Sequence, residues 1–245
     1  MTDLNALSRL SETEKVSKTS ILESIKEIPQ NELLLNLGLF IDQRLMSRLL
    51  FLNFLYQKIL SVQGVAMDLG CRWGQNAVVL QTLRSIYEPY NYQRKIIAFD
   101  TFTGFQGVSE KDGMLFKEFD AATSEQYEQK LNTIMSAHEQ SHPLSHICKY
   151  EIVKGDIRFT MADYIKKHPE TIVSLAFFDL DLYEPTKEAL AALKPRLTKG
   201  SVLVFDELNY EHCPGETLAV IESLNIQNFS VQRFEHCSRV SYIVL

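Results

Sequence analysis

Short runs of hydrophobic residues alternate along this chain with longer segments in which apolar positions recur at helical spacing. Short apolar runs bounded by glycine or polar residues predict buried β-strands, whereas a period of about 3.6 residues predicts helices. Because the strands and helices alternate, the pattern predicts an α/β fold with a mostly parallel sheet. The predicted strands are Val65–Leu69, Lys95–Phe99, Tyr150–Val153, Val173–Phe178 and Ser201–Phe205, followed by an antiparallel pair, Phe229–Phe234 and Val240–Leu245.

The helices are predicted from the same pattern and from their start signals. A helix begins near Gln75, and a Thr-x-x-Gln capping box predicts that another begins at Thr123 and runs to about His138. Between these two segments, several glycines interleaved with aromatic residues are typical of a mobile loop over a binding site. Further helices are predicted over Phe159–Lys167, from about Pro185 onward and over Gly215–Leu224.

The N-terminal segment differs from the α/β region. About twenty mostly polar residues open the chain, and the helical segment Leu45–Leu60 that follows is apolar on too many sides for a surface helix of a monomer. We therefore expect a helical arm and cap over residues 1–62 and an α/β domain over residues 63–245. One sheet face can cover only one stripe of Leu45–Leu60, so we expect the remainder to be buried in a homo-oligomer, most simply a two-fold dimer. The alternative is that the N-terminal arm, Leu4–Ile28, folds back over the exposed side within one chain.

Acidic residues follow two consecutive predicted strands. Asp179 and Asp181 come after the run that ends at Phe178, and Asp206 and Glu207 come directly after Phe205. Because the carboxyl ends of parallel strands face one crevice, we expect these four side chains to converge. Gathered carboxylates repel one another unless a positive charge lies among them, and hard oxygen ligands suit Mg²⁺ or another divalent cation.

A glycine turn follows the first strand. Asp68 lies in that strand, Gly70 and Gly74 bracket the turn, and a helix starts immediately afterwards. Glycines let the backbone approach a ligand closely, but the spacing is not that of a dinucleotide pyrophosphate loop. Asp100 closes the second strand, where an acidic residue commonly accepts hydrogen bonds from an adenosine ribose. The sequence therefore favours an adenosyl cofactor without a pyrophosphate.

Two sequence elements resemble the class I S-adenosylmethionine-dependent methyltransferases, and more narrowly the macrocin/novobiocin-type sugar O-methyltransferases. They are FFDLDLYEPT and GSVLVFDE, and the resemblance extends over roughly residues 64–245. It implies a Rossmann-like seven-stranded sheet of order 3-2-1-4-5-7-6 with a terminal antiparallel strand. It also implies that Asp179, Asp206 and Glu207 bind Mg²⁺, although the family has Asp in place of Glu207. It further implies that Asp68, Gly70, Asp100 and Asp156 line the cofactor site. We also expect Gly74 of the glycine turn, and Thr101 and Phe102 directly after Asp100, to belong to that site.

The resemblance implies methyl transfer to a hydroxyl group, and the residues suggest how the proton leaves. A sugar hydroxyl is a poor nucleophile at neutral pH, so a cation beside it and a positioned base would both assist the reaction. If the strand continues past Phe178, Asp181 faces the same side as Asp179 and can accept the proton. His212, in a predicted loop at the same edge, is the reserve base.

Composition restricts the partners. The net charge is −6 without a basic block, so nothing indicates binding to nucleic acid. No segment has the length and apolar character of a membrane span. Four scattered cysteines without CxxC spacing favour a reducing cytoplasm and argue against a structural zinc site.

Several alternatives stay open at the level of sequence. The acceptor can be a nucleotide-linked, natural-product or surface-polysaccharide sugar, or a non-sugar molecule such as a phosphorylated intermediate. A metal-independent methyltransferase would use Asp181 or His212 without a cation. A nicotinamide-dependent oxidoreductase and a non-enzymatic binding module are the remaining classes, and the latter leaves the strand-end acids unexplained.

Overall fold

The computed structural model describes residues 11–245, which fall into two compact units. The first unit ends at Arg48 and the second comprises Leu49–Leu245.

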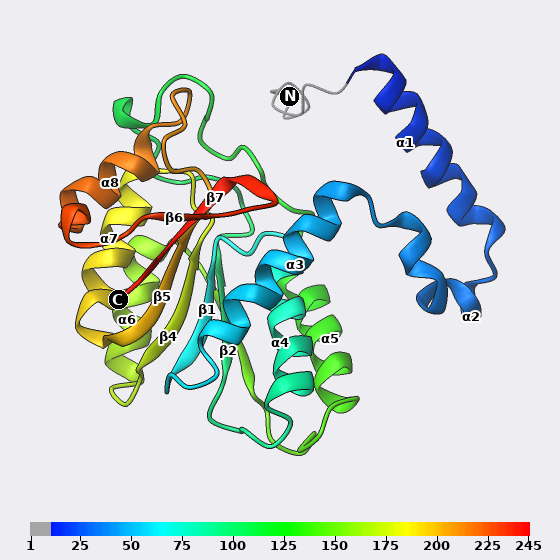
Figure 1. The fold of residues 1–245 in the computed structure, drawn as a ribbon, viewed down its shortest axis with the longest axis horizontal. Coiled ribbons are helices and arrows are strands. Elements are labelled where there is room, and N and C mark those ends of the chain that lie inside the picture. Colours follow the sequence, from blue (N-terminus) through cyan, green and yellow to red (C-terminus); the bar gives the residue numbers. More distant parts are fainter. Residues whose placement is uncertain (1–10) are drawn as a thin grey trace. The chain divides into compact units, whose positions relative to one another are not determined.

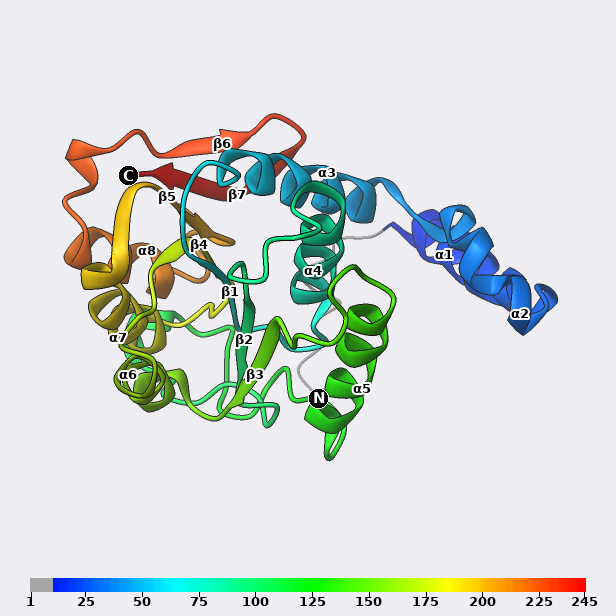
Figure 2. The same ribbon diagram turned by 90° about the horizontal axis from the view of Figure 1, so that it is seen from below.

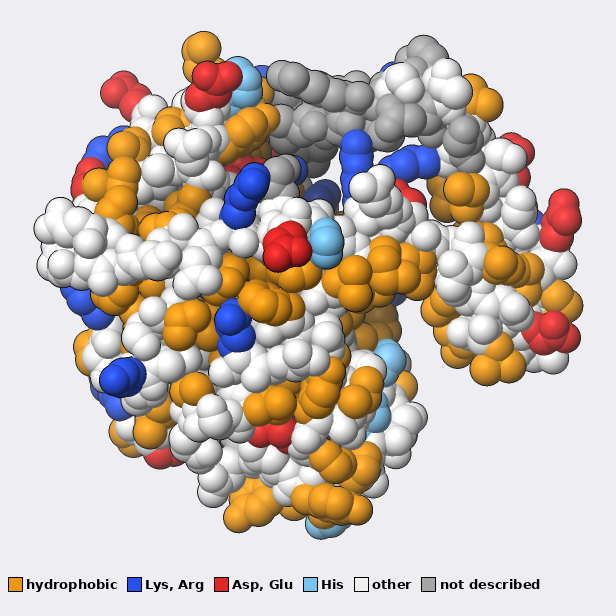
Figure 3. All heavy atoms as spheres, in the orientation of Figure 1, with side chains coloured by type: hydrophobic (Ala, Val, Ile, Leu, Met, Phe, Trp, Pro, Cys, Tyr) orange, Lys and Arg blue, Asp and Glu red, His pale blue; other side chains and the backbone are white. Residues whose placement is uncertain are grey.

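The first unit consists of short helices. They are α1 (Glu12–Ser24), the 3-10 helix η2 (Ile25–Glu27), α2 (Gln30–Leu33), the 3-10 helix η3 (Leu34–Phe40) and the start of α3 (Gln43–Lys58). The Asp42 carboxylate accepts a hydrogen bond of 2.8 Å from the Leu45 backbone N–H, which satisfies one of the free donors at the start of α3. Large apolar side chains of this unit lie at its surface, as Figure 3 also shows; they include Val16, Leu22, Leu34, Leu35 and Leu39.

The second unit is built on a seven-stranded sheet of order β3-β2-β1-β4-β5-β7-β6 (Figure 1). Strands β1 to β5 are parallel to one another, and β7 is antiparallel to both β5 and β6. The strand order and the terminal antiparallel pair agree with the sequence-based prediction. The strands are β1 (Val65–Leu69), β2 (Ile96–Asp100), β3 (Tyr150–Lys154), β4 (Val173–Phe178), β5 (Leu197–Phe205), β6 (Gln232–Phe234) and β7 (Cys237–Val244).

Helices cover both faces of this sheet (Figures 1 and 2). Alternate side chains of β4 point to opposite faces, so that Leu175 and Phe177 belong to one hydrophobic core and Ala176 and Phe178 to the other. The first core is closed by α3, α4 (Gln75–Tyr87) and α5 (Tyr127–Gln140), and the second by α6 (Ile157–Lys167), α7 (Tyr183–Leu193) and α8 (Gly215–Ser223). The remaining 3-10 turns are η4 (Glu110–Asp112), η5 (Lys194–Arg196) and η6 (Ile226–Asn228).

Arg94 organises the amino-terminal end of the sheet. Its guanidinium, which is 2% exposed, donates hydrogen bonds to the Gly64 and Ile59 carbonyl oxygens and to the Ser174 hydroxyl. It is also paired with the Glu88 carboxylate at 2.9 Å. These bonds connect α3, α4, β1 and β4 at the end of the sheet that lies away from the strand-end acids.

Two local predictions were wrong. The helix expected from Thr123 begins at Tyr127, with Gln126 in the left-handed conformation and without a side-chain cap. The Thr123 hydroxyl instead donates to the Phe102 carbonyl oxygen at 3.0 Å, so a contact distant in sequence replaces the expected cap. The fourth strand ends at Phe178 and does not continue to Asp181, whose φ of 61° belongs to a turn.

Candidate active site

The carboxyl ends of β1, β4 and β5 lie side by side and bring the predicted acids together. Phe178 is in register with Phe205, so Asp179 and Asp206 follow neighbouring strands at the same level. The Asp179 backbone N–H donates to the Leu69 carbonyl oxygen at 2.9 Å, and that of Asp206 donates to the Phe178 carbonyl oxygen at 3.2 Å. These backbone hydrogen bonds extend the pairing between strands to Asp179 and Asp206, and they fix the backbone positions from which both carboxylate side chains project.

Asp181 reaches the same cluster from a turn. Its left-handed backbone conformation is one that Asp tolerates better than most residues do. The side chain keeps partial exposure, yet burial of the carboxyl group and the negative charges of Asp179 and Asp206 raise its pKa to about 8. The surroundings of Asp181 therefore disfavour a further negative charge in this cluster.

Arg239 contributes a positive charge to this cluster. It lies on β7, and its guanidinium forms an ion pair with the Glu207 carboxylate and lies 3.7 Å from Asp206 Oδ2. The Glu207 side chain is 3% exposed, and its Oε2 atom is buried without a hydrogen-bond partner. A buried carboxylate oxygen without a hydrogen-bond partner is rare in folded proteins, because it loses its contacts with water and gains none in return. Its presence here indicates a site that accepts a further group.

Glu216 is an acid of the cluster that the sequence analysis missed. It lies in the first turn of α8, is fully buried, and its Oε1 accepts a 3.4 Å hydrogen bond from the Glu207 backbone N–H. Burial, together with the charges of Asp181, Asp206 and Asp179, raises the pKa of Glu216 well above its usual value. A signal was present in the sequence, because Glu216 is an acidic residue in the first turn of α8, the helix that follows β5.

The donor set fits a divalent cation in kind. Asp179, Asp206 and Glu207 offer hard carboxylate oxygens at one edge of the sheet, and Glu207 Oε2 is left without a partner. Within residues 11–245, no three or more His, Cys, Asp or Glu side chains form a group that could hold a metal ion in the positions observed. Asp206 and Glu207 instead face the Arg239 guanidinium.

The glycine turn after β1 depends on glycine at position 70. Gly70 has a φ of 88°, and a Cβ atom there would lie 2.0 Å from the Asp179 carbonyl oxygen. Close contact between this turn and the end of β4 therefore requires a residue without a side chain. Gly74 precedes α4 with a φ of 79°, and a Cβ at that position would meet the Leu131 side chain at 2.2 Å.

Asp68 and Asp100 hold the backbone around this turn. Asp68 is fully buried and accepts hydrogen bonds from the Asn76 side chain and the Ala77 N–H, which fixes the start of α4. Asp100 accepts hydrogen bonds from the Arg72 N–H at 2.7 Å and the Phe102 N–H at 2.6 Å. Burial raises the pKa of Asp100 despite these bonds.

The other predicted cofactor residues lie in the loops that follow β2 and β3. The Thr101 hydroxyl donates to the Gly104 carbonyl oxygen at 2.7 Å, and Phe102 is buried. Asp156 caps α6 by accepting from the Arg158 N–H at 3.0 Å, and its carboxylate is also paired with the Arg158 guanidinium. Each of these residues therefore shapes the crevice through its own protein contacts.

His212 lies in the loop between β5 and α8, as predicted. Its imidazole is about half exposed, 3.4 Å from the Glu211 carboxylate, and packs edge-on against the Tyr210 ring. Its role as reserve base stays a prediction.

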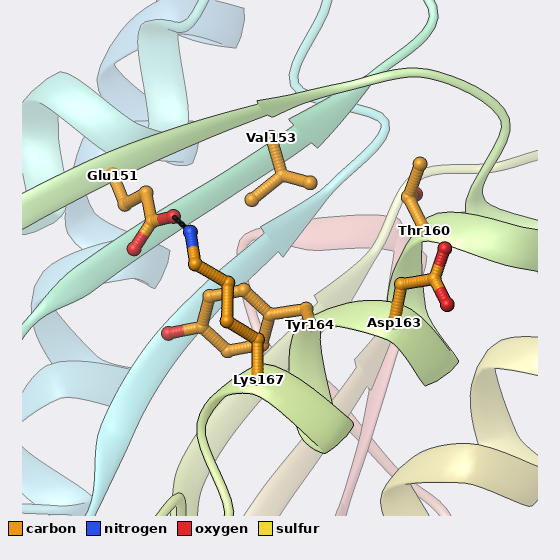
Figure 4. Close-up of a pocket in the computed structure, with 6 residues that line it drawn as sticks. All are labelled: Glu151, Val153, Thr160, Asp163, Tyr164 and Lys167. Carbon is orange, nitrogen blue, oxygen red and sulfur yellow. Dashed lines mark ion pairs between the residues drawn. The ribbon is translucent and has the colours of Figure 1, made fainter.

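A separate surface pocket lies between β3 and α6 (Figure 4). Lys167 extends across it toward Glu151, with the Nζ and Oε1 atoms 4.0 Å apart. The residues lining it, Glu151, Val153, Thr160, Asp163, Tyr164 and Lys167, are not among those predicted for the site.

Comparison with known proteins yields full-length relatives among solved structures. The structure described as CalS11, calicheamicin methyltransferase, is 36% identical, covers 100% of this chain and 97% of its own, and has a TM-score of 0.93. A second structure, described as apo CalS11, TDP-rhamnose 3′-O-methyltransferase, is 35% identical over 99% of this chain and 98% of its own, with a TM-score of 0.87. The O-methyltransferase NovP is 17% identical over 81% of this chain and 79% of its own, with a TM-score of 0.61. No protein-family model and no curated protein matches the chain.

The sheet order, the glycine turn after β1 and these relatives together define a class I S-adenosylmethionine-dependent O-methyltransferase. The chain belongs to the macrocin/novobiocin-type sugar O-methyltransferase family. S-adenosylmethionine is accordingly the cofactor, and the oxidoreductase and binding-module alternatives are set aside. Within the described residues, no helix combines the length and hydropathy needed to cross a membrane.

Proposed function

We propose that this enzyme methylates a hydroxyl group of a nucleotide-linked deoxyhexose. The observation that carries the proposal is 35% identity over 99% of the chain to a structure described as a TDP-rhamnose 3′-O-methyltransferase. The acidic crevice at the ends of β4 and β5 supports it, because vicinal sugar hydroxyls suit carboxylates and a hard cation. The acceptor class and the position methylated belong to the proposal.

Each crevice residue has a proposed task. Asp179, Asp206 and Glu207 would hold a divalent cation, which supplies positive charge that lowers the pKa of an adjacent hydroxyl and of nearby carboxyl groups. Asp181, in its carboxylate form, accepts the proton of the reacting hydroxyl, and His212 is the reserve acceptor. Positioning of the hydroxyl in line with the sulfonium methyl group supplies the remaining acceleration.

The cofactor would lie over the glycine turn. Asp100 uses both carboxylate oxygens to accept backbone N–H groups, but a carboxylate has about four lone-pair sites, so it can also accept hydrogen bonds from ribose hydroxyls. Gly70 keeps the backbone of the turn close to the Asp179 carbonyl oxygen at the end of β4, so a cofactor bound over the turn would lie beside the proposed cation ligands. Asp68, Gly74, Thr101, Phe102 and Asp156 would complete the cofactor site through the backbone that they hold in place.

Incubation with methyl-labelled S-adenosylmethionine and a panel of acceptors tests the proposal. The panel contains nucleotide-linked deoxysugars, the matching free sugars, a natural-product glycoside, a polysaccharide fragment and a phosphorylated non-sugar. We expect the label on a nucleotide-linked sugar, and NMR of the product gives the position. Transfer only to a non-sugar or to a glycoside would contradict the nucleotide-linked acceptor.

A metal-independent reaction is the second candidate, and one observation favours it. The Arg239 guanidinium lies against Asp206 and Glu207, where it can neutralise them without a cation. Methyl transfer that survives a chelator at the rate seen with Mg²⁺ would support this candidate. Loss of activity with chelator and recovery on adding Mg²⁺ would support the cation.

Two wider proposals follow from the sequence. A homodimer would cover the apolar side chains exposed on the first unit and on Leu50 and Leu60 of the second. A cytoplasmic location fits the four cysteines, which are all free.

A further inference from the structure

Arg239 lies against two of the three proposed cation ligands, Asp206 and Glu207. It projects from β7, the strand that is antiparallel to β5, whose carboxyl end carries Asp206 and Glu207. Its side chain is 56% exposed, whereas those of Asp206 and Glu207 are 12% and 3% exposed. A half-exposed arginine thus covers two carboxylates that are largely withdrawn from water.

The Asp206 and Glu207 carboxylates cannot bind the Arg239 guanidinium and a divalent cation through the same oxygen atoms at the same time. The guanidinium contacts Glu207 Oε1 and lies 3.7 Å from Asp206 Oδ2, so it takes lone pairs that a cation would require. A divalent cation at the same oxygens would also repel the guanidinium at short range. The arginine can leave without backbone movement, because its long stem is flexible and its position is exposed.

We propose that Arg239 is a built-in counter-ion that competes with the divalent cation for Asp206 and Glu207. This inference rests on the proposed use of a cation by the enzyme. Arg239 neutralises the carboxylates in the metal-free protein and is released toward the solvent side when the cation binds. The Tyr210 ring, whose centroid is 6.0 Å from the guanidinium carbon, offers a surface on which the released side chain can rest.

A purely structural ion pair makes the opposite prediction. If Arg239 served to orient Asp206 and Glu207, its removal would leave these side chains less ordered and would weaken cation binding. Under competition, the cation binds more tightly once the arginine is gone. The sign of the change in affinity therefore separates the two roles.

The test is calorimetric titration of the full chain with Mg²⁺, without S-adenosylmethionine or acceptor. We expect Arg239→Gln to bind Mg²⁺ roughly tenfold more tightly than the wild type, the order expected for losing one charge-assisted contact. Arg239→Lys keeps the positive charge but not the planar guanidinium, so its affinity should fall between the two. In thermal melts, metal-free Arg239→Gln should be less stable than the wild type and should gain more from Mg²⁺.

Arg196→Gln is the matched control. Arg196 lies in η5 at the amino end of β5 and donates to the Pro169 carbonyl oxygen at 2.6 Å, so its replacement changes net charge equally but away from the crevice. Its Mg²⁺ affinity should equal that of the wild type. An equal gain in both Gln variants would show a general charge effect and overturn the inference.

The remaining outcomes are equally decisive. Unchanged or weaker Mg²⁺ binding by Arg239→Gln overturns competition, as does an absence of Mg²⁺ binding in every variant. Methyl transfer to nucleotide-linked sugars is measured in a separate assay on the wild type, with and without chelator. That assay tests the proposed acceptor, and the Mg²⁺ titrations test the competition by Arg239, so either proposal can be contradicted without the other.

Discussion

The carboxylates of the crevice are chemically alike but have different surroundings. Asp181 lies in a turn with its pKa raised to about 8, whereas Glu207 is held against Arg239. Glu216 is fully buried behind them, and Asp100 is occupied by two backbone N–H groups. Because the environment sets the protonation and the partners of each acid, single substitutions should separate cofactor binding from chemistry.

Substitution of the proposed cation ligands should remove turnover while sparing the cofactor. Asp206→Asn removes a charged ligand at the end of β5, so we expect turnover to be lost and the affinity for S-adenosylmethionine to be nearly unchanged. Asp179→Asn should behave in the same way. Asp100→Ala is the converse variant and should weaken cofactor binding by about 1–3 kcal/mol. Calorimetry with S-adenosylmethionine and a turnover assay make the comparison; parallel losses in all three variants would contradict this division.

The proposed proton acceptor has a separate signature. Asp181→Asn is nearly isosteric, so acceptor and cofactor should still bind while turnover falls by roughly 10²–10⁴, the usual contribution of a positioned base. Steady-state kinetics with a nucleotide sugar check this through the split between kcat and KM. His212→Gln is the companion variant, because near-normal turnover in Asp181→Asn combined with a large loss in His212→Gln would move the role to His212.

At the scale of elements, the crevice is held by loops that contact one another. Asp112, in η4 of the loop after β2, accepts a 2.6 Å hydrogen bond from the Tyr183 N–H at the start of α7. Gly215, which opens α8, packs so tightly on Asp112 that a Cβ would lie 2.0 Å from Asp112 Oδ1. The turn that carries Asp181 is thereby fixed between two other loops.

Ion pairs between elements predict how stability depends on pH. Burial opposes ionisation of Glu139, but hydrogen bonds from Lys149 and Arg84 outweigh it and lower its pKa below 4.5. Arg94 and Tyr56 lower the pKa of Glu88 against burial in the same way. Since both folded pKa values lie below the unfolded one, this stabilisation is complete above about pH 4.5 and is lost as the pH falls through the folded values.

Urea unfolding at pH 7 and at pH 4 measures this effect. The wild type should lose stability between the two values, and Glu139→Gln should lose less because it lacks one of the titrating groups. At pH 7 the variant should be less stable than the wild type, since Arg84 and Lys149 stay buried without their carboxylate. An identical pH dependence in both proteins would mean that Glu139 does not contribute.

At the scale of the whole molecule, the two units differ in how far their large apolar side chains are buried. In the second unit, Phe51, Leu52 and Leu55 of α3 are fully buried in the core against the sheet. In the first unit, Leu34 and Leu35 are 78% and 86% exposed. Exposed apolar residues on this scale mark a surface that associates with something else, and a two-fold dimer is the commonest closed arrangement.

Light scattering across a concentration series tests the dimer. We expect a mass near twice the chain mass of 28.1 kDa, with Leu34→Glu combined with Leu35→Glu shifting the protein toward the monomer. Ile86→Glu is a suitable control, because Ile86 is 64% exposed on α4 of the second unit. A mass that stays near 28.1 kDa at high concentration would exclude self-association.

Much of the framework was determined by the sequence alone. The limits of Val65–Leu69 and Val173–Phe178 were predicted correctly, because continuous apolar runs between polar residues leave little choice for a buried strand. The strand order followed from resemblance carried by the motifs around Asp179 and Asp206. The position of these acids at neighbouring strand ends followed from parallel topology, which converts order along the chain into proximity in space.

The tertiary structure decided what surrounds these acids. Arg239 follows Glu207 by more than thirty positions, and no local pattern indicates that the two side chains meet. Packing between elements that are distant in sequence also buries Glu216 and determines the turn at Asp181. It likewise decides that the Thr123 hydroxyl donates a hydrogen bond to the Phe102 carbonyl oxygen. Periodicity reports which face of an element is buried, whereas the partner on that face is set by the energy of the assembled fold.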